Sequence, residues 1–195
     1  MLQRDSGCLH TKRGRLNLKA SERIETARLV LRRPLKTDLE DIFARYASDP
    51  DVTRFVSWPR HASLADTQAF FAFSEAEWNR WPAGPYLVHS RADGMLLGST
   101  GLAFETPYRA STGYVLAQDS WGNGYAIEAL KAMVETARMV GVRRLYAVCH
   151  VEHRASWRVL EKGGFLREGI LHQHAKFPNL IPDGPTDVFC YAVVL

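Results

Sequence analysis

The sequence predicts one α/β domain of the α+β kind, with a mixed, mostly antiparallel central sheet of about seven strands flanked by about four helices. Strand-like and helix-like segments follow one another in the order β-α-α-β-β-β-α-β-α-β-β, so most consecutive strands are joined as they are in antiparallel sheets. The chain has 195 residues, of which 46% are hydrophobic, and this is enough for one substantial core.

Each predicted element is bounded by residues that favour turns or helix caps. Pro34 ends the first strand, Ser63 is placed to cap the second helix, and Gly94 lies in a hairpin turn. The predicted strands are 27–33, 86–91, 95–105, 112–117, 144–148, 164–174 and 185–195. The predicted helices run from Thr37 or Asp38 to Asp49, from Ser63 to about Trp81, from Gly124 to Val140, and from Glu152 or His153 to Gly163.

Parallel pairing is predicted in the middle of the chain. Strand 112–117 is followed by a helix at 124–140, whose apolar residues recur at spacings of 3, 4 and 7, and then by the short apolar strand 144–148. Gly141 ends this helix. A strand, a helix and a strand in this order form a βαβ crossover, which joins parallel neighbours.

Charge and cysteine content narrow the possible classes of protein. The formal net charge of +4 comes from residues 1–23, which hold six Lys and Arg against two acidic residues. We therefore predict a basic N-terminal tail at 1–23, solvated or touching RNA weakly, ahead of a single domain at 24–195. No apolar run is long enough for a membrane span, and Cys8, Cys149 and Cys190 form no C-x-x-C pair, so the expected compartment is the cytoplasm.

Two glycines, Gly122 and Gly124, lead directly into the helix at 124–140. Backbone N–H groups in the first turn of a helix have no partner within the helix, and the peptide dipoles add a partial positive charge there. Glycines leave these groups uncovered, so we predict a phosphate-binding site. No Gly-Lys-Ser/Thr follows, which excludes a nucleotide triphosphatase loop, and Ile127 stands where a dinucleotide fingerprint needs a third small residue.

Longer segments carry a resemblance to a known family. The glycine pair lies within ASTGYVLAQDSWGNGYAIEA (110–129), and EHRASWRVLEKGGFLREG (152–169) follows it. Upstream lie ETARLVLRRPLKTDLEDIF (25–43) and SDPDVTRFVSWP (48–59). In this order and spacing, the four segments resemble the GNAT N-acetyltransferase superfamily, especially its RimJ/RimL-type (ribosomal-protein N-acetyltransferase-like) branch, over residues 24–195.

The resemblance implies a site for acetyl-CoA. It implies that the fourth and fifth strands, 112–117 and 144–148, splay apart with the acyl-CoA in the gap. Backbone groups of Val115 and Leu116 would then pair with the pantetheine amides. The pyrophosphate would meet the N–H groups of the segment Trp121, Gly122, Asn123, Gly124, Tyr125, Ala126 and Ile127.

Two residues depart from the pattern of the family. Asp119 stands where many members carry Gln or Arg, and a carboxylate beside a phosphate site is repulsive, so we expect it to point away or to cap the loop. His153 stands where the branch usually has the Asn that contacts the cofactor. A histidine can donate one N–H there, or it can be a surface residue of the first helical turn.

The resemblance implies the catalytic role of Ser156, and positions on the predicted strands suggest the other catalytic groups. Ser156 matches the serine of the signature and would be the general acid and a cofactor contact, unless it only bonds its own helical turn. Glu105, at the end of the third strand, would be the base or a solvated carboxylate. A backbone N–H near Val115 or Leu116 would stabilise the oxyanion, and His150 could face the acyl group or assist the base.

The acceptor is predicted to be a primary amine that attacks the thioester directly. The aromatic residues Phe55, Trp58, Tyr86 and Tyr108 could wall its pocket, or Trp58 could only pack its loop. The branch favours a protein N-terminal α-amine; a small-molecule amine and a non-catalytic acyl-CoA-binding module are the alternatives. No metal site is predicted, because His150, His153, His172 and His174 lack a nearby thiolate or a suitably spaced carboxylate. We expect a monomer or a homodimer.

Overall fold

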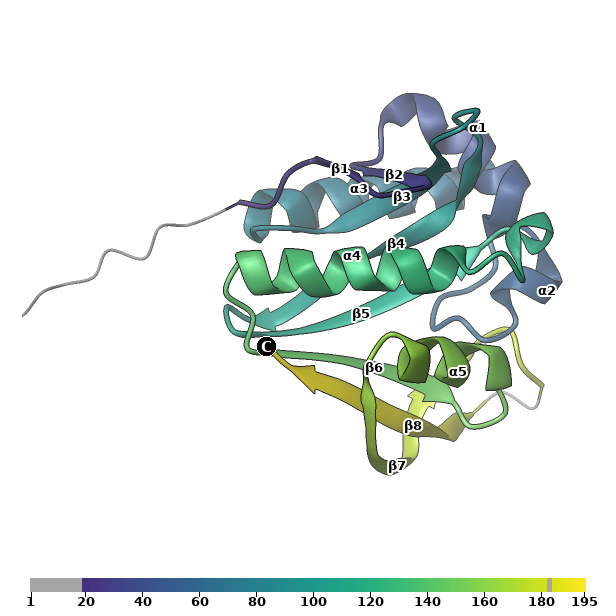
Figure 1. The fold of residues 1–195 in the computed structure, drawn as a ribbon. Coiled ribbons are helices and arrows are strands. Elements are labelled where there is room, and N and C mark those ends of the chain that lie inside the picture. The colour runs from purple at the N-terminus through teal and green to yellow at the C-terminus, as the bar shows by residue number, and fades with distance from the viewer. Residues whose placement is uncertain (1–18, 182–183) are drawn as a thin grey trace, which may run out of the picture.

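A computed structural model describes residues 19–181 and 184–195, and these form one eight-stranded sheet with helices on both faces (Figure 1). The strand order is β1-β2-β3-β4-β5-β6-β8-β7. The strands are β1 (Arg23–Glu25), β2 (Leu29–Arg32), β3 (Pro85–Ser90), β4 (Leu96–Thr106), β5 (Arg109–Leu116), β6 (Arg144–His150), β7 (Leu166–Lys176) and β8 (Pro185–Val194). The helices are α1 (Leu39–Ile42), α2 (Pro50–Thr53), α3 (Leu64–Arg80), α4 (Tyr125–Met139) and α5 (Arg154–Lys162).

The predicted fold class is confirmed: all neighbouring strands are antiparallel except β5 and β6, the pair that the crossover through α4 makes parallel. The first predicted strand, 27–33, corresponds to β2, and an additional strand, β1, precedes it and is joined to it by a tight turn. In that turn the Thr26 N–H donates to the carbonyl of Leu29. The predicted count of about seven strands therefore becomes eight.

The folded part of the chain begins earlier than predicted. Ala20 is buried and its N–H donates to the carbonyl of Pro82, while β1 already includes Arg23. The proposed boundary between residues 23 and 24 therefore falls inside β1. The basic segment 1–18 lies outside the described residues.

The first predicted helix is broken into short pieces. It comprises the 3₁₀ turn η1 (Lys36–Asp38), α1 and the π-helical turn η2 (Phe43–Ala47). Asp49-Pro50, which signalled an end, also begins α2: Pro50 occupies the first turn and the Asp49 side chain accepts from the N–H groups of Asp51 and Val52.

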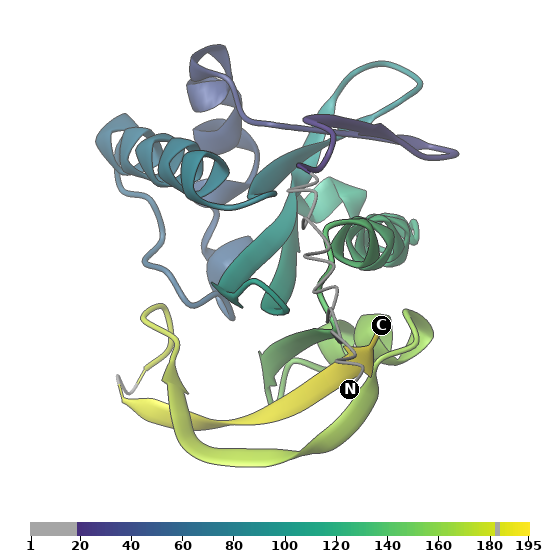
Figure 2. The same cartoon turned by 90° about the vertical axis from the view of Figure 1, so that its left-hand side faces the viewer.

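Helices cover the two faces of the sheet unequally. On one face α4 buries Leu130 and Met133 completely against strand residues that include Leu102 and Leu145. On the other face α1, α2 and α3 cover only the half of the sheet that holds β3 to β5, as Figure 2 shows. Among the described segments, no helix lies on this second face over β6 to β8. The sheet is therefore open on one side beside the β5–β6 pair.

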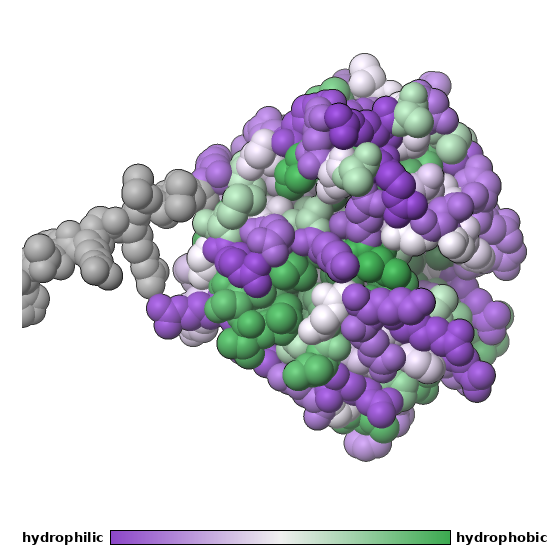
Figure 3. All heavy atoms as spheres, in the orientation of Figure 1, coloured by the Kyte–Doolittle hydropathy of each residue, from purple (hydrophilic) through white to green (hydrophobic). Residues whose placement is uncertain are grey.

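Apolar side chains also gather on the surface near the C-terminus (Figure 3). Met139, the last residue of α4, and Val194, the last of β8, are exposed. They lie at the opposite end of α4 from Gly124, so they take no part in the site described below. No helix within 19–181 and 184–195 has the length and hydropathy to cross a membrane.

Candidate functional site

Strands β5 and β6 separate after three paired residues. Arg109–Ser111 pair with Arg144–Tyr146, but β5 continues to Leu116 and β6 to His150 without further pairing between them. Meanwhile β5 remains paired with β4, and β6 with β8, as far as these ends. The predicted opening between the two strands is confirmed, and one edge of each strand faces it.

The glycine loop lies at the open end of β5. Gly122 has φ 78° and Gly124 has φ 76°, a left-handed conformation that favours glycine. Gly124 caps α4 without a side-chain hydrogen bond. A Cβ atom on Gly122 would meet nothing within 4 Å, and one on Gly124 would meet only an Arg28 guanidinium nitrogen at 3.6 Å. The first-turn N–H groups are thus available to an anionic ligand.

Arg28, from the turn between β1 and β2, holds this helix start in place. Its Nε donates to Glu128 Oε2 at 2.7 Å and its Nη1 donates to the carbonyl of Asn123 at 2.8 Å. Its guanidinium lies 4.8 Å from the ring centre of Tyr125. Burial disfavours the charge on Glu128, but hydrogen bonds from Thr26 and Arg28 outweigh burial and lower the pKa of the carboxyl. Arg28 thus places a positive charge beside the proposed phosphate site.

Asp119, one of the two residues that depart from the family pattern, forms an ion pair. Arg45 of η2 donates to its two carboxylate oxygens at 2.9 Å each and also, through Nε, to the carbonyl of Leu96. The Arg45 hydrogen bonds hold the pKa of the Asp119 carboxyl below its usual value. The repulsion expected from an isolated carboxylate is therefore balanced by a guanidinium from another segment.

Removing Arg45 is expected to weaken acetyl-CoA binding. In Arg45→Met, an unpaired Asp119 would face the diphosphate, and since this carboxylate is half exposed the cost is modest, about threefold to tenfold in Kd. Titration calorimetry measures it, and the loss should shrink in high salt. The control is Arg45→Met combined with Asp119→Asn, which should regain most of the affinity; a double variant as weak as the single one contradicts the explanation.

Ser156, the predicted acid, lies in the first turn of α5 and faces the opening. Its Oγ is 3.1 Å from the hydroxyl of Tyr114, and this hydroxyl donates to the Ser156 carbonyl at 2.8 Å. Tyr114 belongs to the part of β5 that has left β6. Burial raises the pKa of the Cys149 thiol, on β6, to about 11. The sequence analysis missed Tyr114, because only the strand separation shows that it meets Ser156.

His153, predicted as a cofactor contact, stacks on Phe55, predicted as an acceptor contact. Their ring centres are 4.7 Å apart with an angle of 20° between the planes. Burial, together with the nearby His150, lowers the pKa of His153 to about 4, so this ring is neutral at pH 7. His150 lies 5.2 Å from the ring centres of both Phe55 and Phe177. One aromatic cluster thus joins the segment after α2, the end of β6, the N-cap of α5 and the loop between β7 and β8.

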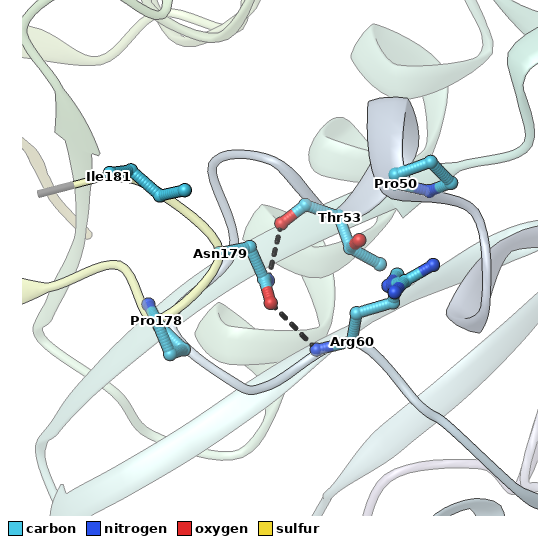
Figure 4. Close-up of a pocket in the computed structure, with 6 residues that line it drawn as sticks. All are labelled: Pro50, Thr53, Arg60, Pro178, Asn179 and Ile181. Atoms are coloured by element: carbon cyan, nitrogen blue, oxygen red, sulfur yellow. Dashed lines mark hydrogen bonds between the residues drawn. The ribbon is translucent and has the colours of Figure 1, made fainter. Parts of the chain in front are cut away.

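Asn179 fastens the loop after α2 to the loop between β7 and β8 (Figure 4). Its Nδ2 donates to the carbonyls of Thr53 at 2.7 Å and Trp58 at 3.0 Å, while its Oδ1 accepts from the Arg60 N–H at 2.8 Å. Trp58 is half-buried against a group of core residues that includes Ile42 and Leu87. The two loops border a cavity of about 320 Å³, lined by Pro50, Thr53, Arg60, Pro178, Asn179 and Ile181. No feature of the sequence had singled out Asn179.

The assignment of Tyr86 to an acceptor pocket is wrong. Its side chain is completely buried, packs edge-on against Trp78, and donates to the carbonyl of Ser21. Tyr108 is exposed, but it lies in the turn between β4 and β5, where its carbonyl accepts from the N–H groups of Arg143 and Arg144. This is the closed end of the β5–β6 pair, so Tyr108 lies away from the opening.

The structure does not bring Glu105 to Ser156. Its carboxylate forms an ion pair with Arg109 at 2.6 Å and accepts a hydrogen bond from Tyr146, both at the closed end of the strands. Tyr114 pairs with Thr100 and Arg109 with Thr106, so Glu105 lies roughly 16 Å farther along the sheet at a rise of ~3.3 Å per residue. Glu105 is therefore not placed to act as the base.

The carbonyl groups of Val115 and Leu116 both face other parts of the chain. A Cβ atom on Gly98 would lie 2.0 Å from the carbonyl oxygen of Val115, so this carbonyl points at β4 and away from the opening. The carbonyl of Leu116 points in the opposite direction, and it accepts a hydrogen bond from the indole N–H of Trp121 at 2.8 Å. Because the direction alternates, Thr112 and Tyr114 join Leu116 in facing the opening, and Val115 does not.

Comparisons with known proteins agree with this geometry. Residues 28–166 match the family described as "Acetyltransferase (GNAT) domain". An uncharacterised N-acetyltransferase of Bacillus subtilis, YoaA, is 31% identical over 180 residues, which are 88% of this chain and 96% of that protein. RimL, a ribosomal L7/L12 α-N-protein acetyltransferase solved with coenzyme A, superposes with TM-score 0.78 at 23% identity over 89% of this chain and 98% of RimL.

Fold and site together define an acyl-CoA-dependent N-acetyltransferase with acetyl-CoA as its co-substrate. The chain belongs to the GNAT family of acetyltransferases. The chain also shares its fold with RimL, a protein of the branch that its sequence resembles. A spermidine N-acetyltransferase of Vibrio cholerae has the same fold, with TM-score 0.72 at 16% identity over 87% of this chain and 96% of that one.

Proposed function

We propose that the acetyl group passes from acetyl-CoA to a primary amine bound on the open face of the sheet. The observation that carries this proposal is the separation of β5 from β6 directly beside an uncovered helix start. In this arrangement the N–H groups of 122–127 bind the diphosphate, and the pantetheine follows the free edge of β5. The thioester then comes to lie beside Ser156.

The open face offers the acceptor a direct approach. Gly113 is exposed on β5, and a Cβ atom there would meet nothing within 4 Å. Tyr114, its neighbour, turns toward α5 and Ser156, so Gly113 faces the opposite side of the sheet. An amine that comes over Gly113 can add to the face of the thioester carbonyl group that is turned toward the open side of the sheet.

A protein N-terminal α-amine is the acceptor class we propose first. An α-amine has a pKa near 8 and a lysine amine near 10.4, so the α-amine needs roughly 3 kcal/mol less for deprotonation at pH 7. It therefore depends less on a strong base, which agrees with the displacement of Glu105 from the site. The fold shared with RimL supports this acceptor class. The fold is also shared with the spermidine N-acetyltransferase, so a small-molecule amine is the alternative acceptor. We propose the cytoplasm as the compartment.

Incubation of the protein with acetyl-CoA and a panel of amines tests the proposal. The panel contains peptides with free N-termini, the same peptides with blocked N-termini, and polyamines. Release of coenzyme A thiol with the free peptides, together with a mass increase of one acetyl group on them, is expected. Turnover of polyamines alone would move the assignment to small molecules, and no thiol release with any amine would contradict it.

A further inference from the structure

Tyr114 is the side chain most closely tied to Ser156. Its hydroxyl lies 3.1 Å from Ser156 Oγ and donates to the Ser156 carbonyl at 2.8 Å. It comes from the part of β5 that no longer pairs with β6, so it spans the opening from one wall to the other. Ser156 Oγ therefore has a hydrogen-bond partner outside its own helical turn.

The two hydroxyls can share their protons in two ways. When the Tyr114 hydroxyl donates its hydrogen bond to the Ser156 carbonyl, the Ser156 hydroxyl donates to Tyr114 Oη. If Tyr114 instead donates to Ser156 Oγ, the Ser156 proton is free to point into the opening. A serine hydroxyl is one donor with two acceptor lone pairs, so it can accept from Tyr114 and donate to a sulfur atom at the same time.

We propose that Tyr114 is a positioning residue that orients the hydroxyl of Ser156 toward the departing coenzyme A sulfur. This inference rests on the proposed function, in which Ser156 is the acid. Burial raises the pKa of Tyr114, so its hydroxyl stays protonated and remains a donor throughout the working pH range. Tyr114 therefore supplies a hydrogen bond and gives up no proton.

The proton balance of the step is closed. The amine nitrogen forms the new C–N bond, and the C–S bond breaks with its electron pair remaining on sulfur. Ser156 passes its hydroxyl proton to that sulfur and regains one from the amine nitrogen, directly or through water. The proton lost by the amine thus appears on the thiol, and Ser156 and Tyr114 end as they began.

Tyr114→Phe tests the inference. We expect kcat to fall about tenfold to a hundredfold, while the Kd for acetyl-CoA changes less than twofold, because only the orientation of the acid is lost. Ser156→Ala is expected to lower kcat at least as far. The decisive comparison is the double variant, which should be no slower than Ser156→Ala alone, since Tyr114 acts only through that hydroxyl.

Tyr191→Phe is the matched control. Its hydroxyl, from β8, bonds Glu161 of the same helix α5 at 3.0 Å, so its loss removes a similar anchor without touching Ser156. We expect this variant to keep kcat within twofold. A Tyr114→Phe protein as fast as wild type, or one that slows the Ser156→Ala enzyme further, overturns the inference. A fully active Ser156→Ala also overturns it, whereas failure of the proposed function shows as a wild type inactive on every amine.

Discussion

Replacing Gly124 by glutamate is expected to abolish acetyl-CoA binding, with a rise in Kd of at least a hundredfold, or about 2.7 kcal/mol. Gly124 has φ 76°, where a side chain is strained, and it directly precedes the first turn of α4. The new carboxylate would lie among the N–H groups that receive the diphosphate, so it would both block and repel the ligand. Acetyl-CoA should raise the melting temperature of wild type and leave that of the variant unchanged.

Gly141→Glu provides a control with the same charge and the same strain. Gly141 has φ 85° and open space around its Cβ position, but it follows the other end of α4, roughly 22 Å away at ~1.5 Å per residue. Its melting temperature should fall as that of Gly124→Glu does, yet acetyl-CoA should still stabilise it fully. If acetyl-CoA stabilises Gly124→Glu as strongly as wild type, the diphosphate does not bind at this helix start.

Features that depend on neighbouring residues could be predicted from the sequence. The glycine pair, the helix that follows it and the crossover to β6 lie within one continuous stretch, and the physical rules that they obey are local. The opening between the strands was also expected, but through the resemblance to a family. Hydrophobic spacing alone does not say where two parallel strands stop pairing.

Contacts between distant segments could not be predicted in this way. Arg28 lies 100 residues from Glu128, Arg45 lies 74 from Asp119, and Asn179 lies 126 from Thr53. Each is a polar side chain in a turn or a loop, where its sequence context does not reveal its partner. Three segments that frame the site are therefore held by side chains whose role only the fold reveals.

Tyr86 and Glu105 show why the site role of a single side chain is hard to predict from the sequence. An aromatic ring in a strand suits a pocket wall, but β3 is covered on both faces, and its residues 86–88 are all completely buried. Glu105 was placed correctly on the end of β4, yet the open end of the β5–β6 pair lies in the other direction along the sheet. Both errors concern which end or face of a strand is accessible, and this depends on how the helices cover the sheet.

Replacing Gly113 by leucine is expected to close the acceptor path and to lower kcat/KM for the amine at least thirtyfold, or about 2 kcal/mol. The side chain would stand on the exposed face of β5, opposite to Tyr114, where the amine must approach the thioester. A Cβ atom there meets nothing within 4 Å, so the fold accepts the change. Acetyl-CoA should still raise the melting temperature of this variant.

Gly169→Leu separates obstruction from a general effect of the substitution. Gly169 is also an exposed strand glycine with nothing within 4 Å of its Cβ position, but it lies on β7, away from the opening. Its kcat/KM should stay within twofold of wild type. The kcat/KM of Gly113→Ala should lie between those of wild type and Gly113→Leu, because obstruction grows with side-chain volume. An unchanged kcat/KM in Gly113→Leu would mean that the amine takes another route. Loss of the acetyl-CoA shift in Gly113→Leu would instead mean that the pantetheine, and not the acceptor, crosses this face.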